Sequence, residues 1–249
     1  MARAYKRTCI VLKRTKLKET DAILTMLSDD ESRQVRAVAK GVRRPGSRYG
    51  ARLEPFSVVE AQLHPGRSLE TLGELRCLET NAACREDLSR ATACDCMAEL
   101  LEKAGRDGAA GDARIFPLTR TALAAIGASE TADAPVLACA HMLKACAMLG
   151  FAPSLRSCAS CGRPLPAPTR YSVSAGGAVC DGCAALSGGG DAIDPLVWQM
   201  VGFLLHTPFS EMGQPQRVPA GALLDFTQRW CREHLSLNIR CIEFLRTLP

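Results

Sequence analysis

A chain of 249 residues with an ordinary apolar fraction of 47% can form one large domain or two to three small ones. No apolar run approaches the roughly 18 residues of a membrane-spanning helix, and the basic start leads into a short β-prone stretch. We therefore expect neither a membrane protein nor a signal peptide. The 13 cysteines are mostly dispersed through apolar sequence instead of forming a disulfide framework, which favours a reducing cytosol.

Positive charge is concentrated at the start of the chain. Residues 1–52 contain 14 Lys and Arg against 5 Asp and Glu, a net charge of +9, whereas the remaining residues contain 17 against 21. The overall charge of +5 therefore hides a strongly basic first fifth. Such asymmetry indicates a polyanionic partner, most often nucleic acid, although charge alone is equally compatible with a solvated basic surface.

Five short β-prone stretches follow one another in the first 80 residues. They are rich in β-branched and apolar residues, are bounded by turn-forming residues, and cover residues 8–14, 22–27, 33–39, 56–63 and 68–75. We expect a bulge or bend at Gly73 in the fifth stretch. Five strands in so short a segment predict a small barrel, with the OB-fold as the leading candidate. Periodicity alone does not separate this fold from an SH3-like barrel.

Two basic clusters lie in or beside the connections of this predicted barrel. One follows the first strand, and the other connects the third and fourth strands with three glycines, one tyrosine and no acid. A glycine-rich basic loop can follow a phosphate backbone and a tyrosine can stack on a base; the alternative is a flexible solubilising loop. Because aromatic residues are sparse, we expect electrostatic binding that is indifferent to sequence. The candidate nucleic-acid contacts are Lys13, Arg14, Lys16, Lys18, Arg36, Lys40, Arg43, Arg44, Arg48, Tyr49 and Arg52.

Apolar residues recur at helical spacing after the barrel. The pattern predicts three helices, over residues 89–103, 117–126 and 135–149. The third is almost wholly apolar or small, so we expect it to be the central buried helix, ended by Gly150. His141 and Lys144 are its only basic side chains, and we expect each at the surface or near a helix end.

The end of the chain also predicts helices. One begins at Asp194-Pro195, and two more cover residues 222–235 and 238–248. We expect them to pack back on the first three helices and to complete one helical domain.

Between the two sets of helices lie two C-x-x-C pairs, separated by eighteen residues and formed by Cys158, Cys161, Cys180 and Cys183. This spacing suits one tetrahedral zinc ion, and the alternative is two unrelated pairs of buried thiols. Four thiolates leave no position for water, which predicts one structural zinc ion per chain. Gly162 and Gly182 are expected to give two knuckles their backbone freedom, with a loop and a short hairpin between them.

These patterns predict an α+β multidomain fold. An N-terminal five-stranded OB-fold barrel precedes an all-helical domain that is interrupted by a zinc-ribbon-like insertion with four cysteine ligands. The expected segments are a nucleic-acid-binding barrel at residues 1–80, helices at 81–157, the zinc insertion at 158–187, and completing helices at 188–249. The chain has no GxxxxGK[ST], GxSxG or HExxH motif, and its four histidines are scattered. We therefore nominate no catalytic residue and expect no enzyme.

Three stretches of the chain resemble one known family. The first runs from Val35 to Arg44 and continues at Arg52-Leu-Glu-Pro-Phe56, the second runs from Leu149 through both cysteine pairs, and the third spans residues 234–245. They are similar to passages of the RecO family of DNA-repair and recombination mediator proteins. They also occur in the family's order and sample the whole chain.

The resemblance implies both a fold and a function. The fold is an OB-fold followed by a helical domain with a zinc insertion, although zinc is not universal in the family. The function is to bind single- and double-stranded DNA, to anneal complementary strands, and to help load RecA onto strands coated by single-strand-binding protein. The implied partners are RecR and the acidic C-terminal tail of single-strand-binding protein, with RecA reached indirectly, in the cytoplasm at the nucleoid.

Two points stay open. The family's pocket for the acidic tail uses basic side chains, and the third predicted helix offers only His141 and Lys144, so we leave this pocket unassigned. The competing interpretation of the whole chain is a zinc-ribbon scaffold that binds other proteins and does not act on DNA.

Overall fold

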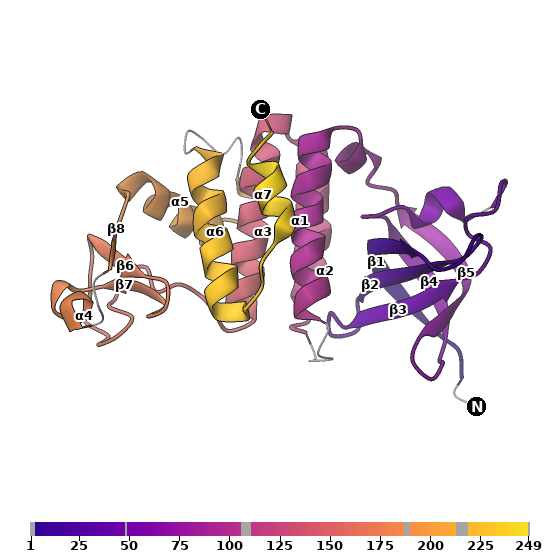
Figure 1. Cartoon of the computed structure of the whole chain (residues 1–249), viewed down its shortest axis with the longest axis horizontal. Helices are drawn as coiled ribbons and strands as arrows, with labels where there is room; N and C mark the ends of the chain where they lie inside the picture. Colours follow the sequence, from indigo (N-terminus) through magenta and orange to yellow (C-terminus); the bar gives the residue numbers. More distant parts are fainter. Residues whose placement is uncertain (1–2, 48, 106–110, 187–189, 213–218, 249) are drawn as a thin grey trace.

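The computed structural model describes residues 3–47, 49–105, 111–186, 190–212 and 219–248. The molecule is elongated: a β-barrel lies at one end, upright helices lie in the middle, and a small module with short strands lies at the other end (Figure 1). None of the helices in these ranges has the length and apolar character that crossing a membrane requires.

The barrel consists of β1 (Tyr5–Lys16), β2 (Ala22–Ser28), β3 (Gln34–Ala39), β4 (Val58–His64) and β5 (Glu70–Glu79). The strands close in the order β1-β2-β3-β5-β4. The β3–β5 pair is parallel, and the other four pairs are antiparallel. The predicted OB-like barrel is thus confirmed, and each predicted strand is present with ends shifted by a few residues.

The predicted irregularity at Gly73 is also present. Ala61 pairs with Leu75 and Leu63 pairs with Leu72, so β5 contains one residue more than β4 over this span. A Cβ atom at Gly73 would lie 2.8 Å from Nε2 of His64, so a side chain there would require the exposed His64 ring to move.

The barrel strands bury two different faces. Inward side chains such as Val11, Leu24 and Met26 fill the barrel. Outward side chains such as Ile10 and Leu27 instead join the core of the helical domain. This double burial anchors the barrel to the helices, because apolar surface on both sides of β1 and β2 is removed from water.

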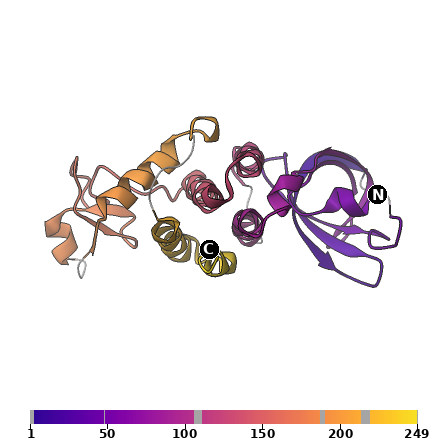
Figure 2. The ribbon, with the colours of Figure 1, turned by 90° about the horizontal axis from the view of Figure 1, so that it is seen from above.

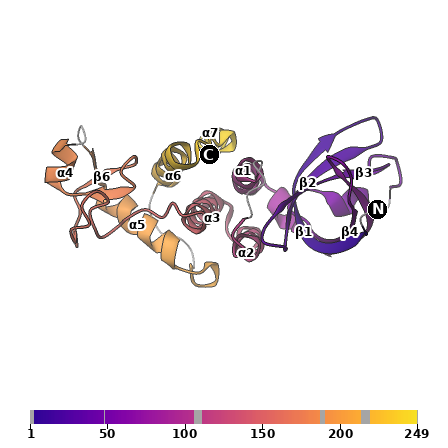
Figure 3. The same ribbon diagram turned by 90° about the horizontal axis from the view of Figure 1, so that it is seen from below.

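The helical domain contains α1 (Leu88–Ala104), α2 (Ile115–Ala128), α3 (Ala134–Met148), α5 (Pro195–His206), α6 (Ala220–Leu235) and α7 (Arg240–Leu245). Short 3-10 turns accompany them as η1 (Gly50–Leu53), η2 (Ala82–Arg85), η3 (Thr131–Asp133) and η4 (Phe209–Glu211). Viewed end-on, α1, α2, α3, α6 and α7 run side by side, whereas α5 lies across them (Figures 2 and 3). One continuous core unites helices from before and after the cysteine segment.

Helix α3 is the central helix, as expected, and Gly150 follows its end with a φ of +95°. The two basic residues of α3 differ from expectation. His141 is fully buried, and its Nε2 lies 2.9 Å from Oγ1 of Thr119. Lys144 is partly buried, and its Nζ donates to the carbonyl of Leu205 at 2.9 Å. Both side chains point into the bundle because neighbouring helices cover α3 on all sides.

The module at the far end holds β6 (Arg170–Ser172), β7 (Gly177–Val179), α4 (Asp181–Leu186) and β8 (Asp191–Ala192). The antiparallel β6–β7 pair is the predicted hairpin. Helix α4, which the sequence did not predict, follows β7 directly.

Candidate nucleic-acid interface and metal centre

Two loops at one end of the barrel are tied together by Arg43. Its Nη1 donates to the carbonyls of Lys18 at 3.1 Å and Glu19 at 3.2 Å, and its backbone N–H donates to the carbonyl of Thr20 at 2.9 Å. Arg43 therefore joins the β3–η1 loop to the β1–β2 turn. The two connections that carry the basic clusters consequently lie side by side.

Asp21 reinforces this junction from the β1–β2 turn. Its Oδ1 accepts a hydrogen bond of 2.8 Å from the backbone N–H of Gly41, where φ is +64°. This bond is the main reason that the pKa of Asp21 is lowered from its usual value, and a bond from the Thr20 hydroxyl adds to it. The ionised carboxylate thus holds the turn that presents the neighbouring cations.

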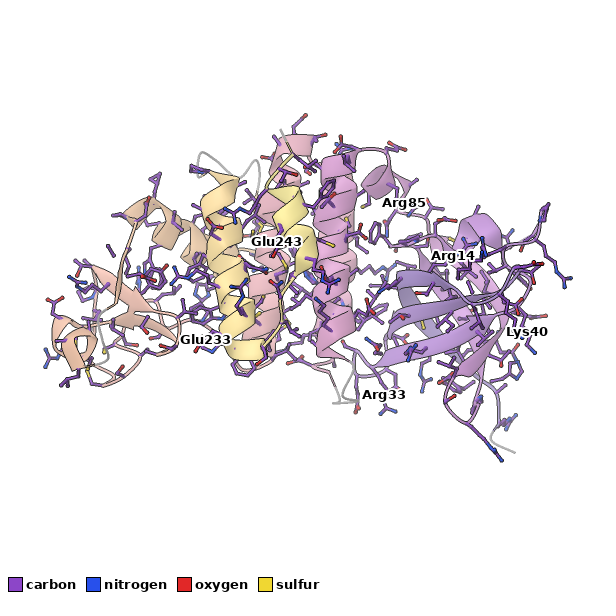
Figure 4. All side chains as sticks on the ribbon, viewed as in Figure 1. Arg14, Arg33, Lys40, Arg85, Glu233 and Glu243 are labelled. Atoms are coloured by element: carbon purple, nitrogen blue, oxygen red, sulfur yellow. The ribbon has the colours of Figure 1, made fainter. Side chains whose placement is uncertain are left out.

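Five cations on or next to these two connections are exposed. No side-chain hydrogen bond or ion pair engages them within the described part of the chain, and we call them the barrel-end cations: Lys16, Lys18, Lys40, Arg44 and Arg52. Lys40 lies at the end of the barrel remote from the helices, whereas Arg33 lies beside them (Figure 4). Arg48, a further predicted contact, lies outside the described residues.

Two other predicted contacts support the barrel. Arg14 is half-buried, and its Nη1 lies 2.8 Å from Oε1 of Glu54 and 3.3 Å from the carbonyl of Gly50. Tyr49 is half-buried and packs against the interior core of the barrel. Both residues therefore hold η1 in place, and only part of the Tyr49 ring is open to a base.

Lys13 and Arg36 lie on another face of the barrel, next to α1. Nζ of Lys13 lies 2.9 Å from Oε2 of Glu102 on α1. Arg36 and Glu102 line the same cavity of about 360 Å³. The structure thus separates these two predicted contacts from the barrel-end cations.

The acids that organise the surface escaped the sequence analysis. Asp21 bonds a residue 20 positions away, and Glu54 and Glu102 pair with cations 40 and 89 positions away. Only Asp21 carried a local signal, because a Thr-Asp pair directly before a strand is typical of a side-chain-stabilised turn.

The four cysteines converge in the far module. Their Sγ atoms all lie within 4.8 Å of one another, so the group could hold a metal ion. The Sγ atoms of Cys161 and Cys180 lie 3.9 Å apart. Four sulfurs on a tetrahedron at the usual zinc–sulfur length of about 2.3 Å would lie about 3.8 Å apart. The arrangement therefore fits a tetrahedral thiolate site.

The first knuckle is built from backbone hydrogen bonds. Gly162 has a φ of +74°, and its N–H donates to the carbonyl of Cys158 at 2.8 Å, as the predicted turn requires. Backbone N–H groups of Cys180 and Cys161 donate to the sulfur of Cys158 and lower the pKa of its thiol to about 6. The knuckle thus favours the thiolate form that a metal ion binds.

The second knuckle differs from expectation at Gly182. This residue has no positive φ and lies in the first turn of α4, so the predicted conformational role of its glycine is wrong. Gly177 instead has a positive φ, of +143°. Its hairpin position brings it against the backbone of Ser154, to which it is bridged.

Comparison with known families gives two matches in chain order. Residues 1–81 match the family described as recombination protein O N terminal, and residues 85–240 match recombination protein O C terminal. The second match alone covers more than half of the chain. The chain belongs to the RecO family. The predicted RecO resemblance is thus confirmed, and a role in DNA repair and recombination follows for this RecO-family protein.

Proposed function

We propose that this protein is a non-enzymatic recombination mediator. It binds single- and double-stranded DNA through the barrel, anneals complementary strands, and helps RecR to load RecA onto strands coated by single-strand-binding protein. The acidic C-terminal tail of that protein is a further partner, and the site of action is the nucleoid in the cytoplasm. Membership of the RecO family supports these partners.

The barrel-end cations carry the proposal for DNA. Five exposed cations on or next to the two joined loops can each approach a phosphate without first breaking an ion pair within the described chain. Phosphate contacts release condensed counterions, which gives sequence-independent affinity that falls steeply with salt. Neutralising two strands on one surface also reduces their repulsion, which is the physical requirement for annealing.

The acidic tail is left without a defined pocket. Lys144 is engaged by the Leu205 carbonyl and His141 is fully buried, so α3 offers no exposed cation to an acidic peptide. The proposal therefore assigns no residue to the contact with the tail.

We also propose that Cys158, Cys161, Cys180 and Cys183 bind one structural zinc ion per chain. The near-tetrahedral spacing of the sulfurs and the thiolate-favouring bonds at Cys158 support this choice. Four protein ligands leave no coordination position for substrate, so the ion would fix the module and take no part in chemistry. Elemental analysis of protein purified without chelator should find one zinc per chain.

The DNA proposal is tested by a matched pair of double variants. Lys40→Ala/Arg44→Ala removes two barrel-end cations, whereas Arg163→Ala/Arg240→Ala removes two exposed cations on the metal module and α7. We expect the first variant to bind an oligothymidine at least tenfold more weakly at about 50 mM salt, with a salt slope reduced by about 1.4. The second should bind like the wild type.

Equal affinity of the two variants for the oligothymidine would contradict the assignment of the barrel end as the DNA-binding surface. Annealing of complementary strands coated with the cognate single-strand-binding protein then tests the mediator role itself. Weak annealing by Lys40→Ala/Arg44→Ala, beside normal annealing by the control, would connect DNA binding to that activity.

A further inference from the structure

Lys13 and Arg36 belong to one row of outward residues across three neighbouring strands. Lys13 on β1 pairs with Thr25 on β2, and Thr25 pairs with Arg36 on β3. The two cations are therefore two strand spacings apart, about 10 Å. This row is separate from the barrel-end cations and faces the helical domain.

The last turn of α1 places a carboxylate over this row. Oε2 and Oε1 of Glu102 lie 2.9 Å and 3.2 Å from Nζ of Lys13. The Glu102 side chain is 16% exposed, whereas that of Lys13 is 50% exposed. Lys13 is thus accessible from solvent, whereas Glu102 is mostly buried between the barrel and α1.

Two features show that the position of Glu102 depends on the barrel. A carboxylate in the last turn of a helix opposes the helix dipole, so the position is unfavourable without a nearby cation. In addition, Nε2 of Gln34 on β3 donates to the backbone carbonyl of Glu102 at 2.9 Å. The barrel therefore fixes both the backbone and the side chain of this residue against the Lys13–Arg36 row.

The space between row and helix remains partly open. A cavity of about 360 Å³ is lined by Arg36, Glu102 and Gln34 together with Thr15, Ile23 and Thr25. Three hydrogen-bonding side chains from the barrel and one cation face it. A phosphate group entering this space would meet Arg36 and the negative charge of Glu102, whose carboxylate pairs with Lys13.

We propose that Glu102 competes with nucleic acid for Lys13, and so withholds the row next to α1 from DNA until a phosphate displaces the carboxylate. This inference rests on the proposed DNA binding by the barrel and adds a regulatory contact to it. A partly exposed ion pair is weak and screened by salt, so phosphates of a bound strand can replace it. The barrel would then have a primary surface at its end and a secondary one next to α1.

The test is Glu102→Gln, which keeps the shape and the acceptor oxygen but removes the charge. Its matched control is Glu79→Gln, because Glu79 on β5 pairs with Arg120 on α2 across the same barrel–helix junction. We expect Glu102→Gln to bind an oligothymidine three- to tenfold more tightly at about 50 mM salt, with a salt slope steeper by about 0.7 for one added phosphate contact. Glu79→Gln should bind like the wild type.

The decisive comparison repeats the Glu102→Gln substitution in protein that also carries Lys13→Ala. The affinity gained by Glu102→Gln should vanish in Lys13→Ala/Glu102→Gln, because the released lysine is its source. Wild-type affinity of Glu102→Gln, or a gain that persists without Lys13, would overturn the inference. Failure of all variants and of the wild type to bind DNA would instead overturn the proposed function, so the two failures are distinguishable. Thermal unfolding of each variant confirms that the comparison involves folded protein.

Discussion

His141 shows how a single buried group couples this fold to pH. It is completely buried on α3, its Nε2 contacts the Thr119 hydroxyl, and its Nδ1 has no partner within the described chain. Burial disfavours the imidazolium form and lowers the pKa of His141 to about 3. The folded protein therefore keeps this ring neutral at any pH near neutrality.

The sign of the resulting pH dependence is fixed by the direction of this shift. In the unfolded chain the pKa of a histidine is about 6.5. Below that pH the unfolded state therefore binds a proton at His141, whereas the folded state does not. The stability contributed by the neutral ring is complete above about pH 6.5. It is lost progressively as the pH falls toward 3, by about 1.4 kcal/mol per pH unit.

We therefore expect the free energy of unfolding to fall by about 2 kcal/mol between pH 6.5 and pH 5 through this residue alone. Denaturant unfolding at several pH values measures the dependence. His141→Gln should flatten it over this range, whatever its effect at pH 7. A similar slope in wild type and His141→Gln would contradict the assignment.

Gly177 illustrates how one element depends on one backbone conformation. It begins β7, has a φ of +143°, and pairs with Ser154 in a parallel bridge. A Cβ atom there would lie 2.5 Å from the backbone nitrogen of Ser154. A residue with a Cβ atom would push the hairpin away from the segment around Ser154 that leads to Cys158.

Gly177→Ala should accordingly disturb the metal module, whereas Gly182→Ala, where a Cβ atom meets nothing within 4 Å, should not. Strain of this kind costs on the order of 1–3 kcal/mol, so we expect metal affinity to fall about tenfold or more in the first variant. Competition with a chromophoric chelator measures it. Equal metal affinity in the two variants would show that the hairpin geometry is not needed for the site.

The elements that the sequence predicted are those set by local pattern. The five strands, the central helix α3 and the Cys158 knuckle each follow from periodicity, turn residues or short spacing. Helix α4 was missed because only six residues follow Cys180 at helical geometry, too few for periodicity to register.

The partners of individual side chains could not be predicted from the sequence, because they are supplied by residues far away along the chain. Lys13 and Lys16 carry the same charge three residues apart, yet only Lys13 faces a carboxylate, which a helix 89 residues later supplies. Arg43 similarly joins two loops because closure of the barrel brings those loops together. Its neighbours in the sequence give no sign of this contact. Composition predicted a basic surface, and tertiary structure decided which cations remain available to it.

The whole molecule separates its two candidate sites. The barrel, which carries the barrel-end cations, lies at one end of the elongated chain and the module with the four cysteines at the other, with the helical domain between them (Figure 1). The module has a small core of its own, which consists of Cys158, Val179 and Ala184 with a few partly buried neighbours. Its other apolar contacts, from Val173 and Tyr171, are with the core of the helical domain. So small a core of its own contributes little folding free energy to the module, and the proposed zinc ion would add to it.

This separation predicts the effect of metal removal. If the four cysteines hold the proposed zinc ion, chelation should unfold the module locally, because metal binding at such a site is coupled to local folding, while the barrel and helical core stay folded. We expect limited proteolysis to cut the treated protein first between residues 150 and 192, and the affinity for an oligothymidine to change less than twofold. Cys158→Ser should reproduce both results without chelator, and readded zinc should restore protection only in the wild type. A tenfold loss of DNA affinity on metal removal, with the helical core still folded, would show that the module itself contributes to the nucleic-acid surface.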